Sequence, residues 1–259
     1  MNSLDSKALH RIKIFLHEQQ IFDKLGVDKS SRNVLPLCFF GSENSSIKTT
    51  EKQLMSNENL NHPILTKSFA LIDAEVGEHG LSAAEYAIAR RIIHSTADFD
   101  YLNLLQCSPN AIASGIKALQ AGAPIVTDVT MVQQGIATLV GKTFQNPIIA
   151  AISKAPVADP GKTRTETGLL KCWAEYPEAI YVIGNAPTAL LALCDRMNNS
   201  AQIPALVIGV PVGFVSVVES KQALTKVNVP QILVKGRKGG SPVAAAIINA
   251  LLILAQEYL

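Results

Sequence analysis

The stretch AIYVIGNAPTAL at residues 179–190 carries the pattern that decides the fold. Its first half, 179–184, is continuously apolar and rich in branched side chains, which is typical of a parallel strand buried on both faces. Asn185 follows at once, and Pro187 stands where a proline suits the first turn of a helix. The stretch therefore predicts a buried strand, a short turn and a helix.

Four other short apolar segments repeat this pattern, namely 123–128 (APIVTD), 147–153 (PIIAAIS), 204–210 (PALVIGV) and 230–236 (PQILVKG). Helical periodicity predicts helices near 63–76, 81–95, 109–121, 130–139, 164–176, 187–197, 216–226 and 241–257. This alternation predicts an α/β domain, doubly wound in three layers, with a mainly parallel five-stranded sheet and right-handed crossovers. Ligands in that architecture bind beyond the carboxyl ends of the strands.

Residues 1–60 differ in character from the rest of the chain. They combine a predicted helix at roughly 5–24, an apolar run at 33–41 and then a polar stretch rich in Ser, Asn, Thr, Lys and Glu. Polar composition of that kind is typical of a linker. We therefore expect an N-terminal extension of unknown role over 1–60 and the α/β domain over 61–259.

Composition excludes several classes of function. Hydrophobic residues make up 48% of the chain, enough for a sizeable core, and the formal net charge is only +2. That charge and an aromatic content of 5% argue against a surface for nucleic acid. The longest apolar run, 244–255, is too short to cross a bilayer, and no signal peptide is evident. We therefore expect a cytoplasmic protein that does not associate with a membrane.

Neither the cysteines nor the histidines indicate a metal centre. The cysteines lie far apart without a CxxC pair, which is typical of reduced, buried thiols: Cys38, Cys107, Cys172 and Cys194. The histidines share no ligand spacing: His10, His17, His62, His79 and His94. We expect no metal, and a reducing compartment.

The loops after the strands are rich in cations. Lys162 and Arg164 follow the 147–153 strand, and the sequence VKGRKGGSP at 234–242 follows the last strand. With few carboxylates nearby, such loops would attract a polyanion. No GxSxG or GxGxxG motif is present, which leaves a serine hydrolase and a dinucleotide-binding enzyme unsupported.

The last of these loops contains three candidate binding residues, Lys238, Gly239 and Ser241. Backbone N–H groups at the start of the following helix could cradle an anion there. The loop can equally be a glycine-rich turn in which Ser241 caps the helix, because it lacks the GxxxxGK[ST] order of a P-loop. Asn185 has the same two interpretations, as a ligand contact or as part of a capped turn.

The segment ARRIIHSTADFD at 89–100 places His94 three and four residues after Arg91 and Arg90 in a helical pattern. At that spacing the three side chains share one surface of the helix. An imidazole beside two guanidinium groups is positioned to exchange a proton with an anionic ligand. The alternative is a structural histidine near the end of a helix, with Arg90 directed to solvent.

Seven segments of the chain carry a resemblance to one known family: SFALIDAE (68–75), RIIHSTADFD (91–100), SPNAIASGIKALQAGAPIVTD (108–128), MVQQGI (131–136), VIGNAPTAL (182–190), IGVPVGFVSVVESKQAL (208–224) and GRKGGSPVAAAIINALL (236–252). In this order they resemble precorrin-8X methylmutase, the precorrin isomerase of cobalamin biosynthesis. The resemblance covers roughly 62–257 and does not extend to 1–60.

This resemblance implies a flavodoxin-like fold, a homodimer and an isomerisation that needs no added cofactor. The family moves a methyl group from C11 to C12 of the tetrapyrrole, a 1,5-sigmatropic shift that gives hydrogenobyrinate or, with cobalt, cobyrinate. The resemblance assigns His94 as the catalytic residue. It assigns substrate contacts to Ser68, Arg91 and Arg164. Lys67 departs from the family pattern, in which arginine is common before the serine.

Two alternatives from other classes stay open. The first is a corrinoid carrier that keeps the pocket without turnover. The second is a regulatory module that binds phosphate or a nucleotide through the GRKGGSP sequence at 236–242. The sequence also leaves open whether the tetrapyrrole carries cobalt.

Overall fold

The computed structural model describes residues 62–258. The predicted helix at 5–24, the apolar run at 33–41 and most of the polar stretch lie outside the described residues. The N-terminal extension and its boundary at 60/61 therefore remain predictions.

All eight expected helices are confirmed. They are α3 (Pro63–Val76), α4 (Ala83–Thr96), α6 (Ala111–Gln120), α7 (Thr130–Lys142), α8 (Arg164–Glu175), α9 (Pro187–Asn198), α10 (Val217–Thr225) and α11 (Ser241–Glu257). Two short helices were not expected, α5 (Tyr101–Leu104) and the 3-10 helix η1 (Ala151–Lys154). Both are only one turn long, too short for periodicity to reveal.

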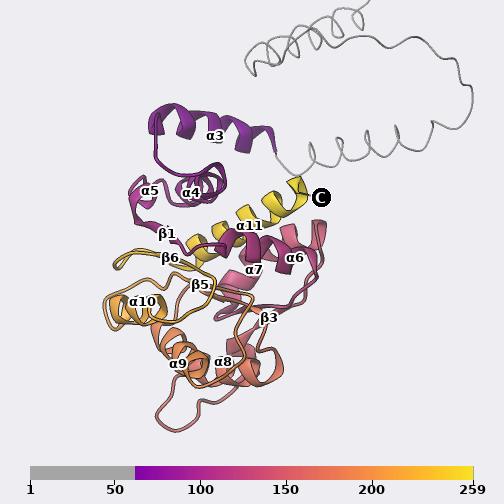
Figure 1. The fold of residues 1–259 in the computed structure, drawn as a ribbon, viewed down its shortest axis with the longest axis vertical. Helices are drawn as coiled ribbons and strands as arrows, with labels where there is room; N and C mark the ends of the chain where they lie inside the picture. The colour runs from indigo at the N-terminus through magenta and orange to yellow at the C-terminus, as the bar shows by residue number, and fades with distance from the viewer. Residues whose placement is uncertain (1–61, 259) are drawn as a thin grey trace, which may run out of the picture. The chain divides into compact units, whose positions relative to one another are not determined.

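The five expected strands form a parallel sheet (Figure 1): β2 (Ile125–Thr127), β3 (Ile148–Ala150), β4 (Ile180–Ile183), β5 (Leu206–Gly209) and β6 (Gln231–Val234). Their spatial order is β6-β5-β4-β2-β3. Counted along the chain this is the order 2-1-3-4-5 of the flavodoxin-like fold. The order reverses between β2 and β4, so the ligand position expected from topology lies beyond the ends of these two strands.

The sheet has six strands, one more than expected. β1 (Leu105–Cys107) pairs antiparallel with β6, with Leu105 opposite Val234 and Cys107 opposite Ile232. It spans three residues and includes the exposed Gln106, so it lacks the continuous apolar run by which the other strands were found. β1 covers the edge that β6 would otherwise expose.

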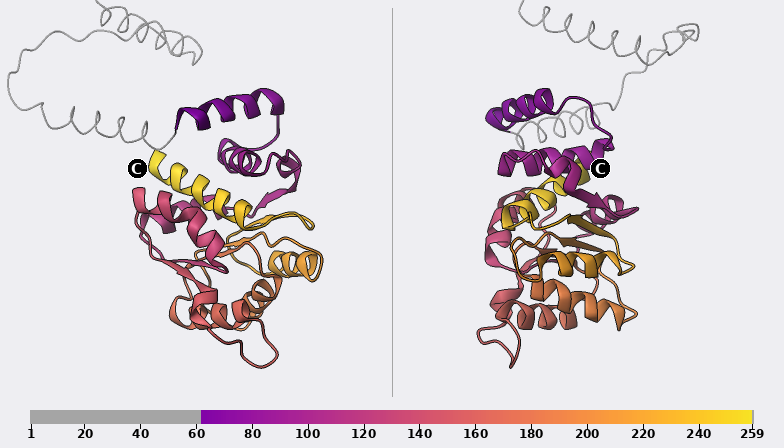
Figure 2. Two further views of the ribbon diagram at one scale, coloured as in Figure 1. Left: turned by 180° about the vertical axis from the view of Figure 1, so that it is seen from behind. Right: turned by 90° about the vertical axis from the view of Figure 1, so that its left-hand side faces the viewer.

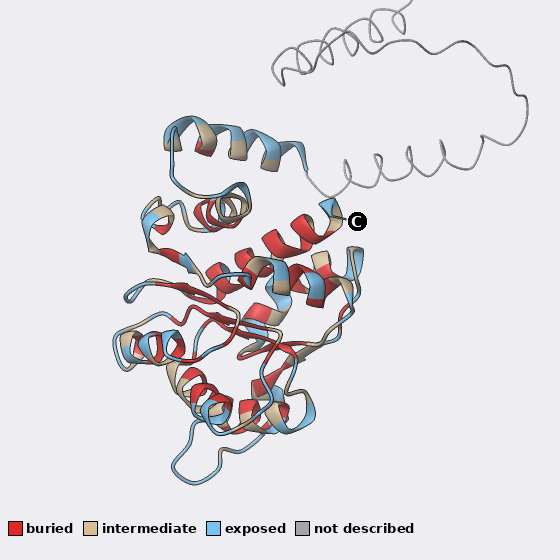
Figure 3. Ribbon diagram, viewed as in Figure 1, coloured by how far each residue is buried: buried red, intermediate tan, exposed pale blue. Residues whose placement is uncertain are grey.

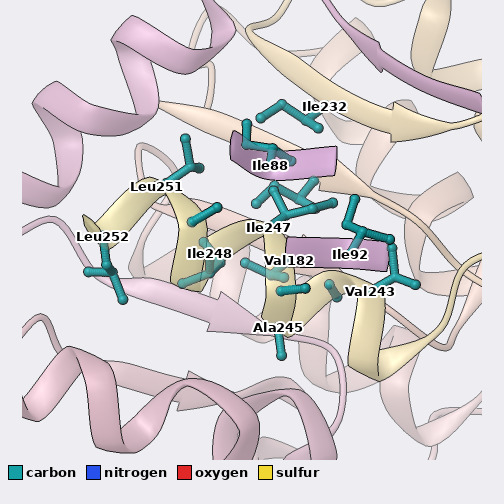
Figure 4. Close-up of a cluster of buried hydrophobic side chains, with 14 of the residues drawn as sticks. Ile88, Ile92, Val182, Ile232, Val243, Ala245, Ile247, Ile248, Leu251 and Leu252 are labelled. Atoms are coloured by element: carbon teal, nitrogen blue, oxygen red, sulfur yellow. The ribbon is translucent and has the colours of Figure 1, made fainter. Parts of the chain in front are cut away.

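Helices cover both faces of the sheet and produce two cores. α6, α7 and α11 lie on one face, and α8, α9 and α10 lie on the other (Figures 1 and 2). α4 packs on the outer side of α11, where Ile88 and Ile92 meet the α11 side chains around Ile247 (Figure 4). α11 is therefore enclosed between α4 and the sheet, which explains why it is buried almost throughout (Figure 3).

α3 forms the outermost layer, against α4. Ile72 is its one buried residue, and the rest of the helix is largely exposed (Figure 3). The start of α4 is fixed by a capping box, in which Ser82 and Glu85 satisfy each other's backbone N–H groups. α4 ends two residues after His94, where Ala97 adopts a left-handed conformation.

Candidate active site

His94 lies in the last turn of α4, and its imidazole is exposed. The Oγ of Ser68 on α3 is 2.8 Å from His94 Nδ1, a hydrogen-bond distance. Within residues 62–258 no other side chain is hydrogen-bonded to this imidazole. Two residues that the sequence singled out separately therefore meet across two helices.

Toward the start of α4 from His94, further polar contacts join α3 to α4. Asp73 of α3 accepts hydrogen bonds from Tyr86 Oη at 2.6 Å and from Arg90 Nη1 at 2.9 Å. Burial, and then the hydrogen bond to Asp73, raise the pKa of Tyr86 to about 12. The idea that Arg90 points freely to solvent is thus wrong, because its guanidinium is half-buried and ion-paired.

An aromatic ring links the cations to the imidazole. The guanidinium of Arg90 lies 4.4 Å from the centre of the Phe69 ring, and that of Arg91 lies 5.6 Å from it. The same ring meets His94 edge-on at 5.6 Å between centroids. Burial, and then the neighbouring charge of Arg90, lower the pKa of Arg91. A half-buried guanidinium of this kind is well suited to bind a carboxylate.

Ion pairs connect the end of α4 to the carboxyl edge of the sheet. The Nζ of Lys238 is 2.6 Å from Asp98 Oδ2 and 2.6 Å from Asp100 Oδ2. Lys238 belongs to the loop after β6, and both aspartates closely follow His94 in the chain. These contacts hold the end of α4 beside the edge where topology predicts ligand binding.

A buried lysine on α10 supports the loop after β6. Lys221 of α10 is buried, and its Nζ donates to the carbonyl oxygens of Gly236 at 2.9 Å and Lys238 at 2.7 Å. Burial lowers the pKa of Lys221 to about 8. Gly239 has a φ of +151°, and a side chain there would collide with the carbonyl oxygen of Val210. The hydrogen bonds from Lys221 and the close approach at Gly239 therefore restrict the conformation of this loop.

Ser241 does not cap α11. The N-cap residue is Gly240, which makes no side-chain cap bond, and Ser241 is the buried first residue of the helix. Glycine is acceptable at an N-cap, and Pro242 in the first turn explains why the helix still begins here.

Asp128 binds the loop after β4 at the point where the strand order reverses. Its carboxylate follows β2, is fully buried and accepts the backbone N–H groups of Val129, Gly184, Asn185 and Ala186. Burial raises the pKa of Asp128, whereas these hydrogen bonds lower it. The loop after β4 is therefore held from within the protein, and the side chain of Asn185 remains exposed at its tip.

Arg164 begins α8, as predicted, behind a capping box formed by Thr163 and Glu166. Its side chain is exposed, and its Nε donates to the carbonyl oxygen of Ala155 at 3.0 Å. Its Nη2 donates to the carbonyl oxygen of Ile152 in η1 at 3.4 Å, so Arg164 ties the start of α8 to η1 and to the residue that follows it.

A pocket of about 300 Å³ lies beside the arginines. It is lined by Phe69, Arg90 and Arg91 together with residues of α4 and α11, and His94 stands outside it. A second cavity of about 730 Å³ adjoins it, between α6 and the start of α4, sharing Ala84 and Tyr258 with the first pocket but containing no residue of the candidate site. The first pocket matters more here because it holds the predicted cations, although it is small for a drug-sized or larger ligand.

The described residues contain no membrane-crossing helix and no metal-binding group. None of the helices in 62–258 is both long and apolar enough to span a bilayer. Over the same residues, no three His, Cys, Asp or Glu side chains gather as metal ligands. Cys107, Cys172 and Cys194 are free thiols, and burial raises the pKa of each, to between about 11 and about 12. Cys38 lies outside the described residues.

Sequence reasoning missed the residues that support the site. Asp73, Tyr86, Asp98 and Lys221 received no role, although each makes a contact that positions a helix or loop. The one available signal was spacing, because Tyr86, Arg90 and His94 recur every fourth residue and so must share one face of α4.

Comparison with known proteins gives a consistent result. The family model described as precorrin-8X methylmutase matches residues 63–254. A Synechocystis protein named cobalt-precorrin-8 methylmutase is 60% identical over an alignment of 210 residues that covers 76% of this chain and 97% of the relative. A Pseudomonas aeruginosa protein named precorrin-8X methylmutase is 41% identical over an alignment of 195 residues that covers 73% of this chain and 93% of the relative.

Solved structures agree with these sequence matches. The crystal structure of a precorrin-8x methyl mutase from Thermus thermophilus superposes with a TM-score of 0.69 at 39% sequence identity. The match covers 75% of this chain and 96% of the other. The residues that the family model matches, 63–254, include both Ser68 and His94.

Proposed function

This chain belongs to the precorrin-8X methylmutase family and is an isomerase of cobalamin biosynthesis, and we propose that it moves a methyl group from C11 to C12 of the tetrapyrrole precorrin-8X or cobalt-precorrin-8. The products would be hydrogenobyrinate and cobyrinate, respectively. The observation that carries the proposal is the Ser68–His94 hydrogen bond beside the half-buried Arg91. The reaction is intramolecular, and we expect it to need no added cofactor.

In the proposed mechanism His94 is the general acid. A histidine that gives up a proton must start as the imidazolium, in which both ring nitrogens carry a hydrogen: Nδ1–H then donates to the Ser68 hydroxyl oxygen, and Nε2–H is left for the substrate. Nε2 then donates this proton, or a hydrogen bond, to a ring nitrogen near the migrating methyl group and so favours the tautomer in which the methyl can shift. The proton returns to His94 afterwards, so the reaction conserves all atoms. Assistance of this kind typically contributes about 10²–10⁴-fold.

The substrate has a flat apolar body with a rim of acetate and propionate groups. We propose that Arg91 binds one of these carboxylates, and that Arg164 and the exposed Asn185 bind others. The loop after β6, which Lys221 supports, carries Lys238, Gly239 and, at its end, Ser241. We propose that this loop presents backbone N–H groups to the rim, because the ammonium of Lys238 is already engaged by Asp98 and Asp100.

The cobalt form is the favoured substrate. The relative at 60% identity is named cobalt-precorrin-8 methylmutase, whereas the Pseudomonas relative named for the metal-free compound is 41% identical. The cobalt would enter with the substrate, and the migrating methyl group is the same in both compounds.

We also propose a homodimer in the cytoplasm. The pocket beside Arg91 is about 300 Å³, and α3 exposes large apolar side chains at Ile64 and Leu71. A second copy packed against this face would enclose a larger cleft and cover these side chains. The free thiols of Cys107, Cys172 and Cys194 support a reducing compartment.

The test is direct conversion. Purified protein is incubated with cobalt-precorrin-8 and with precorrin-8X, and the visible spectrum is followed, together with that of a His94→Ala variant. The variant should bind both compounds while the spectral change stalls. Binding without conversion by the wild type would identify a carrier instead. Stabilisation by nucleotides but not by the tetrapyrrole in a thermal-shift assay would identify a regulatory module.

A further inference from the structure

α3 presents Ser68 to His94, yet its apolar anchorage is small. Ile72, 8% exposed, is its one buried residue, and Phe69 and Val76 pack against the core only partly buried. A helix that buries so little apolar surface gains little from hydrophobic packing. Its position on α4 must therefore depend strongly on polar contacts, of which Asp73 makes two.

The contacts between α3 and α4 follow one another along the two helices. Asp73 meets Tyr86 and Arg90, Phe69 meets Arg90 and His94, and Ser68 meets His94. Residues four apart lie one above the other on a helix, so each of these contacts fixes how α3 is aligned along α4 at the next contact. Ser68 is five residues from Asp73, about 7.5 Å along the helix axis, and the two side chains do not bind each other.

We propose that Asp73 is a positioning residue for His94, which acts through the docking of α3 and the Ser68 hydrogen bond. The inference rests on the proposed function only for its kinetic consequence, because the geometric consequence needs no substrate. The side-chain partners of Asp73 are Tyr86 and Arg90, neither of which is a proposed substrate contact. The effect of Asp73 should therefore appear in turnover and not in substrate affinity.

Arg90 explains why the carboxylate matters more than an ordinary polar contact. Its guanidinium is held by Asp73 at 2.9 Å and lies over the rings of Phe69 and Tyr86. Its Nε is buried and has no partner within residues 62–258. Without Asp73 this cation would lose its counter-ion in a half-buried position and would turn toward solvent. Phe69 would then lose the nearer of the two guanidinium groups that contact its ring, and its edge-on contact with His94 would loosen.

The first experiment is a double-mutant cycle between residues that do not touch. Asp73→Asn and Ser68→Ala should each lower kcat on cobalt-precorrin-8 by roughly 10- to 100-fold, and Asp73→Asn should change KM less than about 2-fold. The double variant should be no slower than the slower single variant, because both changes remove the same hydrogen bond. Glu78→Gln, which removes an exposed carboxylate just after α3, is the matched control and should change neither constant. Effects that multiply in the double variant would overturn the proposal.

The second experiment needs no substrate. Nitrogen-15 NMR of the His94 ring reports the hydrogen bond at Nδ1, and Asp73→Asn should reproduce the spectrum of Ser68→Ala. Tyr86→Phe removes only one bond to Asp73 and keeps the Arg90 ion pair, so it should shift the signal in the same direction by less. A wild-type ring signal in a folded Asp73→Asn protein would disprove the coupling. If the NMR change occurs but the wild type converts no tetrapyrrole, the proposed function fails and the positioning role of Asp73 stands.

Discussion

The carboxylate of Asp128 accepts the backbone N–H of Asn185 at 2.6 Å, across the point where the strand order of the sheet reverses. Flavodoxin-like proteins usually offer this point to a ligand. Here a buried side chain occupies the N–H groups that an anionic ligand would use. The candidate site lies instead toward α3 and α4, and Asp128 serves it by fixing the loop that carries Asn185.

Replacing Asp128 with alanine should therefore destabilise the whole domain. Four backbone N–H groups would lose their acceptor, and a buried donor without a partner costs about 1–3 kcal/mol. Because water can enter the vacated space, we expect a loss on the order of 3–5 kcal/mol in the free energy of unfolding. Urea denaturation measures it, with the exposed Asp195→Ala on α9 as a control that should change stability by less than about 0.5 kcal/mol. Similar midpoints for both variants would refute the role.

Lys221 should make stability depend on alkaline pH. Burial lowers its pKa to about 8 in the folded protein, whereas an unfolded lysine has a pKa of about 10.4. Between these values the unfolded chain binds a proton that the folded chain has released, so the contribution of Lys221 to stability rises with pH. Below about pH 8 both states are protonated and the contribution is flat.

The measurement is the difference in unfolding free energy between the wild type and Lys221→Met. This difference should grow by on the order of 2–3 kcal/mol from pH 8 to pH 10.4 in favour of the wild type. Lys226→Met, at the exposed end of the same helix, should give a difference that stays constant over that range. A constant difference for Lys221→Met as well would show that Lys221 does not titrate there.

Two helical glycines should respond in opposite ways to alanine. A methyl group at Gly168 in α8 would collide with the carbonyl oxygen of Ala151 in η1, whereas one at Gly141 near the end of α7 would meet nothing within 4 Å. Alanine favours a helix by roughly 0.5–1 kcal/mol over glycine. Gly141→Ala should therefore raise the melting temperature slightly. Gly168→Ala should lower it by several degrees, because α8 must move away from η1. Equal shifts in calorimetry would contradict this close approach.

Arg91 should affect substrate affinity more than turnover. Hydrogen bonds to charged groups contribute about 1.5–3 kcal/mol, so Arg91→Met should raise KM by roughly 10- to 100-fold and leave kcat nearly unchanged. Arg91→Lys should fall between, because lysine keeps the charge and loses the two-pronged geometry. Arg196→Met, an exposed cation on the opposite face of the sheet, is the control. An unchanged KM in Arg91→Met would remove Arg91 from the proposed binding site.

Local patterns in the sequence predicted most of the fold. The segment 179–190 combines a strand, a turn and a proline at the start of a helix, so each residue supports the same structure as its neighbours. β1 was missed because three residues with an exposed glutamine in the middle carry no such pattern. Its pairing with β6 depends on a partner more than 120 residues away in the chain.

In the candidate site, too, residues in local motifs were found from the sequence, whereas partners distant in the chain were not. Ser68 and His94 were identified through motifs, and their contact is a fact of the fold. The partners of Lys238 could not be found, because Asp98 and Asp100 lie about 140 residues earlier and only the tertiary structure brings them to the loop after β6. Arg90 was left with two interpretations for a similar reason, since its counter-ion Asp73 is on a different helix.

The thin attachment of α3 separates catalytic competence from global folding. A helix anchored by one buried isoleucine, two partly buried apolar side chains and a few polar contacts can detach while the sheet and α11 stay intact. Amide protons of α3 should therefore exchange with deuterium long before those of β4. On gentle heating, activity should disappear reversibly several degrees below the cooperative melting transition of the domain.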